Sequence, residues 1–157
     1  KVNPNVEILA TRKTLPGLRD IEKRAVVHGG GATHRMRLDD AILIKDNHLK
    51  LSKNIKKSIE ISRSKYPNLM VEVEADNEQQ AIEIAKNGAD RVMLDNFSPD
   101  EATATIRKLR EISDIEIEIS GGVTIENIAS YAKKADFISL GSLTMSSLPV
   151  DFSLHVL

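Results

Sequence analysis

Single charged residues stand where short apolar stretches of the chain end. Lys45 follows four apolar residues, and Glu74 and Asp95 close two later apolar stretches. Lysine is rarely buried without a partner, and carboxylate oxygens suit Mg²⁺, which is often shared with a substrate's phosphates. Each residue alone is equally well explained as a solvated strand end or an ion pair. Three of them at equivalent places favour one shared site.

Small residues follow the last two apolar stretches, as Ser120-Gly121-Gly122 and Gly141-Ser142. Glycine lets backbone N–H groups approach a phosphate closely. A glycine pair after a strand is also an ordinary turn, so this signal is weak by itself.

A group of cations lies mainly in segments that contain glycine and proline: Arg12, Lys13, Arg19, Arg35 and Lys45. Arginine grips a carboxylate with two parallel hydrogen bonds, and lysine acts as a movable point charge. His34 adds a donor or acceptor near neutral pH. These residues predict a site for an anionic substrate.

The 157 residues carry a net charge of −1, which is distributed unevenly. Residues 1–50 and 51–68 each have a net charge of +4, and residues 69–157 one of −9. Many of these charges belong to solvated helix faces, but the division suits an anionic substrate beside a metal ion. Aromatic residues form only 3% of the chain, which leaves little to stack on bases and disfavours nucleic acid.

Cysteine is absent, which excludes disulfides and thiolate metal sites. This fits a reducing compartment, and we expect a cytoplasmic protein. No apolar run approaches the roughly 20 residues of a membrane span, so no membrane association is expected.

Short β-type stretches alternate with helical segments. The last four main strands begin about 20–25 residues apart, which is typical of βα units. A further extended piece is expected near Arg35–Leu38 or Phe152–Val156. Helix starts are predicted at Asp76 with Gln79, at Ser98-Pro99 and at Thr124, and Ile55 and Ile59 should form a buried stripe. The main strands predicted are Val6–Ala10, Ala41–Lys45, Leu69–Glu74, Arg91–Leu94, Glu116–Ser120 and Phe137–Leu140.

This alternation fits either a barrel or a doubly wound sheet. A doubly wound sheet usually has a glycine-rich turn after its first strand, whereas Thr11-Arg12-Lys13-Thr14 follows here. In a barrel, the strand ends converge on one face. We therefore predict a single α/β domain over residues 1–157, a TIM-barrel-like fold that is incomplete or open.

The order of the motifs resembles the barrel domain of the quinolinate phosphoribosyltransferases, over nearly the whole chain. Val73-Glu74, Val92–Asn96 and the glycine segments continue the match, and its first segment is highly specific. The match is carried by Thr11-Arg12-Lys13-Thr14-Leu15-Pro16-Gly17-Leu18-Arg19, by His34-Arg35 and by Leu43-Ile44-Lys45-Asp46-Asn47-His48.

The resemblance implies a Mg²⁺-dependent glycosyltransferase of NAD biosynthesis. It would transfer the ribosyl group of phosphoribosyl pyrophosphate to quinolinate and release nicotinate mononucleotide, pyrophosphate and CO₂. By motif position, the quinolinate carboxylates would be held by Arg12, His34, Arg35 and Lys45. Lys13, Glu74 and Asp95 would serve the pyrophosphoryl donor and its Mg²⁺, and Ser120, Gly121 and Gly141 the 5′-phosphate. Lys45, Glu74 and Asp95 are the expected catalytic residues.

Two departures from the family pattern affect these expectations. Met145 stands where the family usually has histidine, which puts a phosphate contact from that side chain in doubt. The family also has an N-terminal domain before the point where this chain begins, and that domain lends a basic residue to a neighbouring subunit. We therefore expect a homodimer or higher oligomer, and weak or no activity from this chain alone.

Two other functions stay open. One is a related phosphoribosyltransferase for nicotinate or another ring acid, although Arg12, Arg35 and Lys45 supply cations for two carboxylates. The other is a non-catalytic phosphate-binding barrel, against which the intact Lys45, Glu74 and Asp95 argue.

Overall fold

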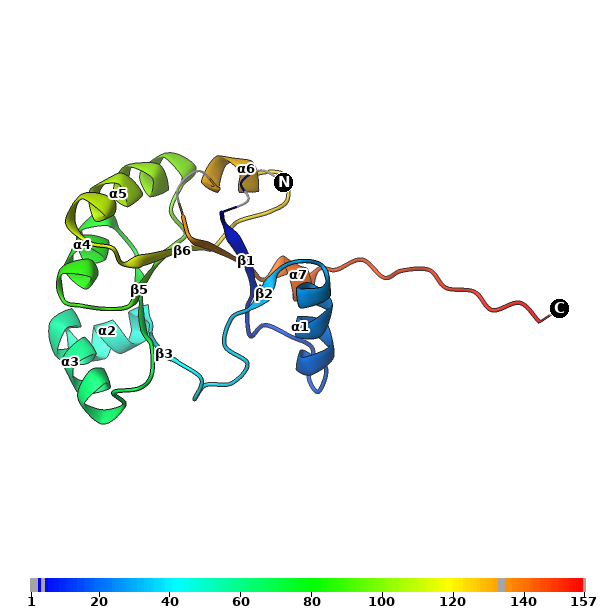
Figure 1. Cartoon of the computed structure of the whole chain (residues 1–157), viewed down its shortest axis with the longest axis horizontal. Coiled ribbons are helices and arrows are strands. Elements are labelled where there is room, and N and C mark those ends of the chain that lie inside the picture. Colours follow the sequence, from blue (N-terminus) through cyan, green and yellow to red (C-terminus); the bar gives the residue numbers. More distant parts are fainter. Residues whose placement is uncertain (1–2, 4, 133–134, 157) are drawn as a thin grey trace.

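A computed structural model of the chain describes residues 3, 5–132 and 135–156. In this part of the chain, seven parallel strands form one sheet in the order β2-β1-β7-β6-β5-β4-β3, which curves into an open barrel (Figure 1). The strands are β1 (Glu7–Ala10), β2 (Ala32–Thr33), β3 (Ile42–Ile44), β4 (Val71–Ala75), β5 (Arg91–Asp95), β6 (Glu116–Ser120) and β7 (Phe137–Leu140).

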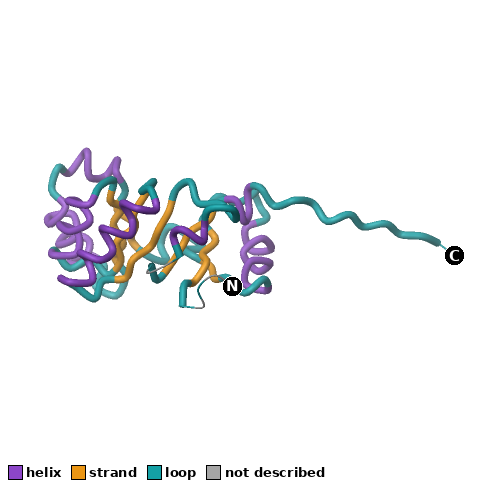
Figure 2. Tube along the Cα trace, turned by 90° about the horizontal axis from the view of Figure 1, so that it is seen from above, coloured by secondary structure: helices purple, strands orange, loops and turns teal. Residues whose placement is uncertain are grey.

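Helices lie on the outside of the curved sheet (Figures 1 and 2). They are α1 (Arg19–His28), α2 (Asp46–Ser52), α3 (Ile55–Lys65), α4 (Glu78–Lys86), α5 (Pro99–Ile112), α6 (Ile128–Tyr131) and α7 (Ser142–Met145). Strands β2 and β3 form the two edges of the sheet, so the barrel is open between them. The predicted barrel is thereby confirmed in its open form.

Alternating residues divide each central strand between two environments. In β4, Val71 and Val73 join the apolar core against the helices, and in β6 Ile117 and Ile119 do the same. Their neighbours in the sequence point to the inside of the curve, because successive side chains of a strand face opposite ways. These inward residues include Glu72, Glu74, Arg91, Glu118 and Ser139, all buried. The inner face of this barrel is therefore polar, whereas barrel interiors are usually filled by branched apolar residues.

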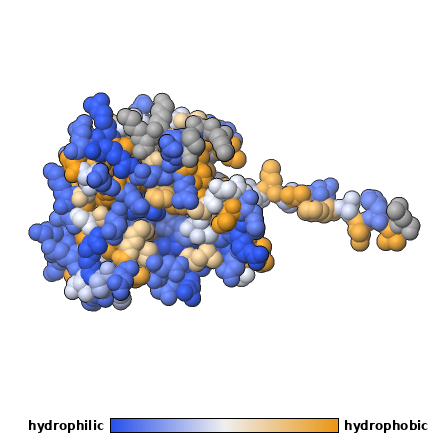
Figure 3. Space-filling model, viewed as in Figure 1, coloured by the Kyte–Doolittle hydropathy of each residue, from blue (hydrophilic) through white to orange (hydrophobic). Residues whose placement is uncertain are grey.

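The six main strands predicted from the sequence are present, with ends shifted by at most two residues. The expected extra strand was placed wrongly, since it is Ala32–Thr33 and pairs with β1. Residues Arg35–Leu38 form the loop after that strand. Phe152–Val156 belongs to an extended, exposed segment that leaves the body of the domain without pairing to the described part of the sheet (Figures 1 and 3).

The starts of the helices show where local sequence signals were enough to predict the structure. Ser98 caps α5 through a capping box with Glu101, as predicted, and Ile55 and Ile59 are buried. The prediction at Asp76 was one residue early, because the Asn77 side chain accepts the Gln80 amide and caps α4.

The prediction at Thr124 was also wrong. The Thr124 amide donates to the Asn127 side chain, which forms a turn, and α6 begins only at Ile128. Among the described residues, no helix has both the length and the apolar character to cross a bilayer.

Candidate functional site

Two adjoining pockets lie where the strands end on the inner side of the barrel. One is a cavity of about 340 Å³ that contains most of the charged residues. The other, of about 370 Å³, contains most of the small residues. They share Thr11, Lys13, Asp95, Ser120 and Ser139. The charged pocket is lined by Arg12, His34, Arg35, Lys45, Glu74 and Glu118, among others.

All ten residues predicted for the site line one or both pockets. Arg12, His34, Arg35, Lys45 and Glu74 line the charged pocket, and Gly121 and Gly141 line the small-residue pocket. Arg35 and Asp95, which come from distant parts of the sequence, thus face one cavity.

A larger hollow of about 770 Å³ lies between residues 14–20 and 36–40. We assign the site to the two smaller pockets, because they contain the strand ends.

The two arginines of the charged pocket are partly buried, and each has a donor atom that no described residue satisfies. Nη1 of Arg35 donates to the carbonyl of Ala41 at 3.2 Å. The Nε atoms of Arg12 and Arg35 are buried and have no hydrogen-bond partner among the described residues. A buried donor without a hydrogen-bond partner costs free energy. Both guanidinium groups are therefore suited to bind an anion.

Lysine and glutamate pair across the neighbouring strand ends. Nζ of Lys45 lies 2.8 Å from Oε2 of Glu74, whose side chain is 8% exposed. The backbone N–H of Lys45 donates to Nδ1 of His48 at 3.0 Å, at the start of α2. Lys45 is itself half exposed, so its ammonium group can meet a ligand from the pocket.

Glycine is required at the wall between the two pockets. Gly121 has a φ of +82°, and a Cβ there would lie 2.8 Å from the backbone nitrogen of Asn96 and closer still to its side-chain oxygen. Asn96 in turn donates from Nδ2 to Oδ2 of Asp95 at 2.6 Å. The close approach of these two loops leaves room for glycine alone.

The loop after β7 is tied to the loop after β1. Oγ1 of Thr144 donates to the carbonyl of Lys13 at 2.5 Å. A Cβ on Gly141 would meet the side chains of Lys13, Met145 and Thr11 at 3.6, 3.7 and 4.0 Å, which are ordinary contacts. Lys13 is thereby held where the two pockets join.

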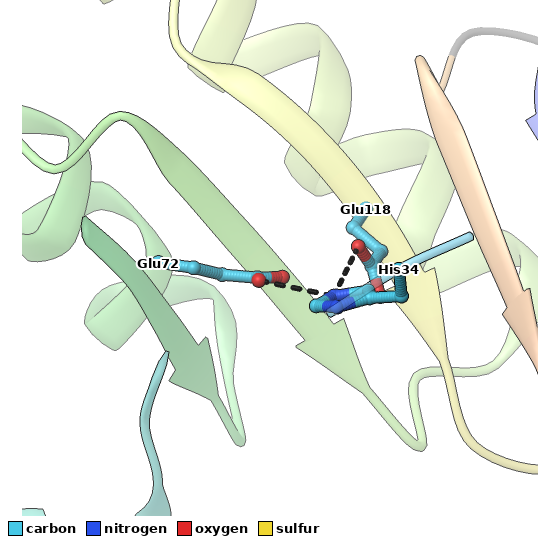
Figure 4. A group of neighbouring side chains, drawn as sticks. All are labelled: His34, Glu72 and Glu118. Carbon is cyan, nitrogen blue, oxygen red and sulfur yellow. Dashed lines mark ion pairs between the residues drawn. The ribbon is translucent and has the colours of Figure 1, made fainter. Parts of the chain in front are cut away.

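In the wall of the charged pocket, His34 lies between two buried glutamates from β4 and β6 (Figure 4). Its Nε2 is 3.1 Å from Oε2 of Glu72 and 3.3 Å from Oε2 of Glu118. Burial lowers the pKa of His34, but hydrogen bonding and charge from Glu118 and Glu72 outweigh it and raise that pKa to about 9. The group therefore favours a positively charged imidazole.

These three side chains could in principle hold a metal ion, since their ligand atoms lie within 4.8 Å of one another. Two observations argue against it. Nδ1 of His34 accepts the Arg35 amide at 2.7 Å, so the neutral ring carries its proton on Nε2, as an imidazolium also would. Glu118 is already bonded to Arg91 at 3.2 Å and to Ser139 at 2.5 Å. We interpret the group as a histidine that carries a proton on Nε2, between two carboxylates.

The hydrogen bond from the Arg35 amide requires Nδ1 of His34 to be unprotonated. The raised pKa of His34 instead favours the imidazolium, which carries a proton on both ring nitrogens. Both place a proton on Nε2, which lies near the two carboxylates but makes no well-aligned hydrogen bond to any described residue. The prediction from sequence missed Glu72 and Glu118. The strict alternation of Val71-Glu72-Val73-Glu74 and Glu116-Ile117-Glu118-Ile119 was the available signal, since both strands are covered by helices.

Comparison with known proteins shows which family this chain belongs to. The family model described as "Quinolinate phosphoribosyl transferase, C-terminal domain" matches residues 1–155. A probable nicotinate-nucleotide pyrophosphorylase (carboxylating) of Archaeoglobus fulgidus is 43% identical over all of this chain and 62% of its own length. The human nicotinate-nucleotide pyrophosphorylase (carboxylating) is 39% identical over 95% of this chain and 51% of its own length.

A solved structure shows the same fold. The crystal structure of NadC from Streptococcus pyogenes superimposes with a TM-score of 0.90 at 39% identity, and the match covers 96% of this chain and 53% of that one. The chain therefore spans between about half and three fifths of the length of these relatives.

Proposed function

The chain belongs to the quinolinate phosphoribosyltransferase family, and we propose that its two pockets serve phosphoribosyl transfer to quinolinate with loss of CO₂. The reaction would give nicotinate mononucleotide, pyrophosphate and CO₂. One observation carries the proposal: cations for a diacid and acids for a metal face the same cavity, next to a glycine-walled pocket. Because the chain spans only part of its relatives, the complete reaction is proposed of the complete protein.

The charged pocket supplies three cations for the two carboxylates of quinolinate. Arg12 and Arg35 have buried Nε donors that no described residue satisfies, and Lys45 presents a half-exposed ammonium group. Arginine binds a carboxylate in a fixed two-point geometry, which would fix the plane of the pyridine ring. His34, whose pKa is raised to about 9, would add positive charge from the wall of the same pocket when its ring is doubly protonated.

The residues fit a Mg²⁺ ion bound together with phosphoribosyl pyrophosphate. Glu74 and Asp95 place hard carboxylate oxygens at adjacent strand ends in one cavity. Two carboxylates and several waters or substrate oxygens form a typical Mg²⁺ environment. When bound, the ion would neutralise charge on the leaving pyrophosphate. Lys13, at the junction of the pockets, would contribute a further positive charge.

The small-residue pocket is suited to the 5′-phosphate. Ser120 offers a hydroxyl group, and Gly121 and Gly141 expose backbone without a side chain in the way. Met145 also lines this pocket, so the phosphate would be bound there without a histidine.

The chemistry then requires positioning rather than a covalent nucleophile. The ring nitrogen forms a bond to C1′ as the bond from C1′ to the pyrophosphate oxygen breaks, and the electron pair leaves with pyrophosphate. The sugar passes through a state with positive charge near C1′, as in glycoside hydrolysis. The cationic ring then accepts the electron pair left at C2 when CO₂ departs, and C2 takes up a proton. Arg12, Arg35 and Lys45 would hold the reacting ring throughout.

We also propose that the complete protein is a cytoplasmic homodimer or higher oligomer. Support comes from the open sheet, whose edge strands β2 and β3 a neighbouring subunit would cover.

The test is an assay of the complete protein with phosphoribosyl pyrophosphate, Mg²⁺ and either quinolinate or nicotinate. We expect nucleotide product from quinolinate and little from nicotinate. Product from nicotinate alone would replace the proposed substrate, and binding of phosphoribosyl pyrophosphate without release of pyrophosphate would indicate a non-catalytic barrel.

A further inference from the structure

A buried lysine in α1 binds the loop that carries Arg35, one of the arginines of the charged pocket. Lys23, in the middle of α1, has no exposed surface. Its Nζ donates to the backbone carbonyl of Arg35 at 2.5 Å. Among the described residues it forms no ion pair with any acid. Lysine is almost never fully buried unless it is paired, so this position needs an explanation.

The charges around Lys23 make its burial less favourable still. Arg19 from its own helix, Arg12 after β1 and Arg35 after β2 all repel it, and Asp40 opposes them in part. The carboxylate of Asp40 already accepts the Met36 and Arg37 amides at 2.7 and 2.9 Å. Burial, followed by repulsion from these arginines, lowers the pKa of Lys23 to about 8.

The same helix holds both loops that carry the pocket arginines. Lys23 binds the carbonyl of Arg35, and Nη2 of Arg19 binds the carbonyl of Arg12 at 3.4 Å. Nη1 of Arg19 also binds the carbonyl of Met36 at 3.2 Å. Helix α1 therefore fixes the spacing of Arg12 and Arg35 through their backbones, at the cost of concentrating cations on one side of the pocket.

We propose that Lys23 is a positioning residue for Arg35, and that the carboxylates of a bound pyridine diacid supply the counter-charge that this buried lysine lacks. The inference rests on the proposed function, since it requires a dianion between Arg12 and Arg35. A diacid there stabilises the charged form of Lys23, so binding is coupled to uptake of a proton. A mono-acid supplies less charge and couples more weakly.

The experiment is titration calorimetry of the complete protein at pH 8 in two buffers with different ionisation enthalpies. The probes are quinolinate and nicotinate, and the proteins are wild type, Lys23→Met and the control Lys86→Met, an exposed lysine at the end of α4. Wild type and the control should take up as much as about half a proton with quinolinate, because a group with its pKa near 8 is half protonated there. Lys23→Met should take up far less, because His34, with its pKa near 9, is already largely protonated at pH 8. It should bind quinolinate about tenfold more weakly, equivalent to one unit of pKa coupling.

If Lys23 had a purely structural role, its replacement would lower the stability of the protein. Methionine has a similar length and no charge, and replacing a poorly compensated buried charge by an apolar side chain is often neutral or stabilising. We therefore expect Lys23→Met to melt at the same or a higher temperature than wild type. Lys23→Gln, which can still donate to the Arg35 carbonyl, should recover part of the affinity but none of the proton uptake.

The outcomes separate the two proposals. Wild type that does not bind quinolinate would overturn the proposed function and this inference together. Wild type that binds quinolinate without taking up a proton, or whose proton uptake persists in Lys23→Met, would overturn this inference alone. So would a Lys23→Met protein that melts well below wild type and loses quinolinate and nicotinate binding equally.

Discussion

Nζ of Lys45 and Oε2 of Glu74 lie 2.8 Å apart, across the ends of the neighbouring strands β3 and β4. This pair joins the two halves of the charged pocket, since the lysine is proposed to meet the diacid and the glutamate to meet Mg²⁺. Each neutralises the other until ligands arrive. Removing either one leaves the other in a partly buried site without its partner.

Lys45→Met should lower kcat/KM for quinolinate by about 100-fold, as expected when one preorganised charge is lost. Glu74→Gln should instead raise the Mg²⁺ concentration needed for half-maximal rate. Steady-state kinetics at varied quinolinate and Mg²⁺ would separate the two effects. Lys50→Met is the control, because Lys50 pairs with Asp46 on the exposed side of α2, outside both pockets. Equal losses in the control would show that the effect is not specific to the pocket.

Arg35 should make the pocket prefer an acid with two carboxylates over an acid with one. Arg35→Met removes a donor group with charge-assisted hydrogen bonds, each worth about 1.5–3 kcal/mol, so quinolinate binding should weaken by roughly 10- to 100-fold. Nicotinate binding should change much less. Dissociation constants for both acids would check this, and an equal loss for both would show that Arg35 does not bind the second carboxylate.

Gly121→Ala tests the wall between the pockets. Alanine at φ +82° is strained, and its Cβ would clash with Asn96, so we expect a loss of about 3 kcal/mol in unfolding free energy and weaker binding of phosphoribosyl pyrophosphate. Gly88→Ala is the matched control, with φ +77° but nothing within 4 Å of the added Cβ, and should cost only about 1 kcal/mol. Denaturant titration measures both. Similar losses in the two variants would contradict the predicted clash.

Stability should depend on His34 in a defined pH window. The pKa of His34 is raised from 6.5 to about 9 in the folded protein, so its contribution is complete below pH 6.5 and is lost as the pH rises through 9. The lowered pKa of Lys23 acts in the opposite direction above pH 8. The difference in unfolding free energy between wild type and His34→Asn should therefore shrink from pH 6.5 to 9. A constant difference would show that His34 is not protonated more readily in the folded state.

The strand ends could be predicted because their signals are local. Glu74, Asp95 and Ser120 each interrupt or close an apolar stretch, and parallel strands bring such ends together. The cap of α5 was equally clear, since Ser98, Pro99 and Glu101 together specify it.

The polar interior could not be predicted with the same rules. Alternating charged and apolar residues usually indicate a strand with one solvated face, yet Glu72 and Glu118 are fully buried. Only the curvature of the sheet around His34 makes that face internal. Lys23 was missed for a related reason, since in the sequence it is one of many charges on a helix, and its burial depends on the loops that cross α1.

The central claim is that one pocket both attaches the ribosyl group and removes a carboxylate from the same ring. The most direct measurement follows pyrophosphate and labelled CO₂ together, using the complete protein, phosphoribosyl pyrophosphate, Mg²⁺ and quinolinate labelled in the carboxylate beside the ring nitrogen. We predict equal amounts of both products at all times in the steady state, with no CO₂ when phosphoribosyl pyrophosphate is omitted. Release of pyrophosphate without CO₂ would contradict it.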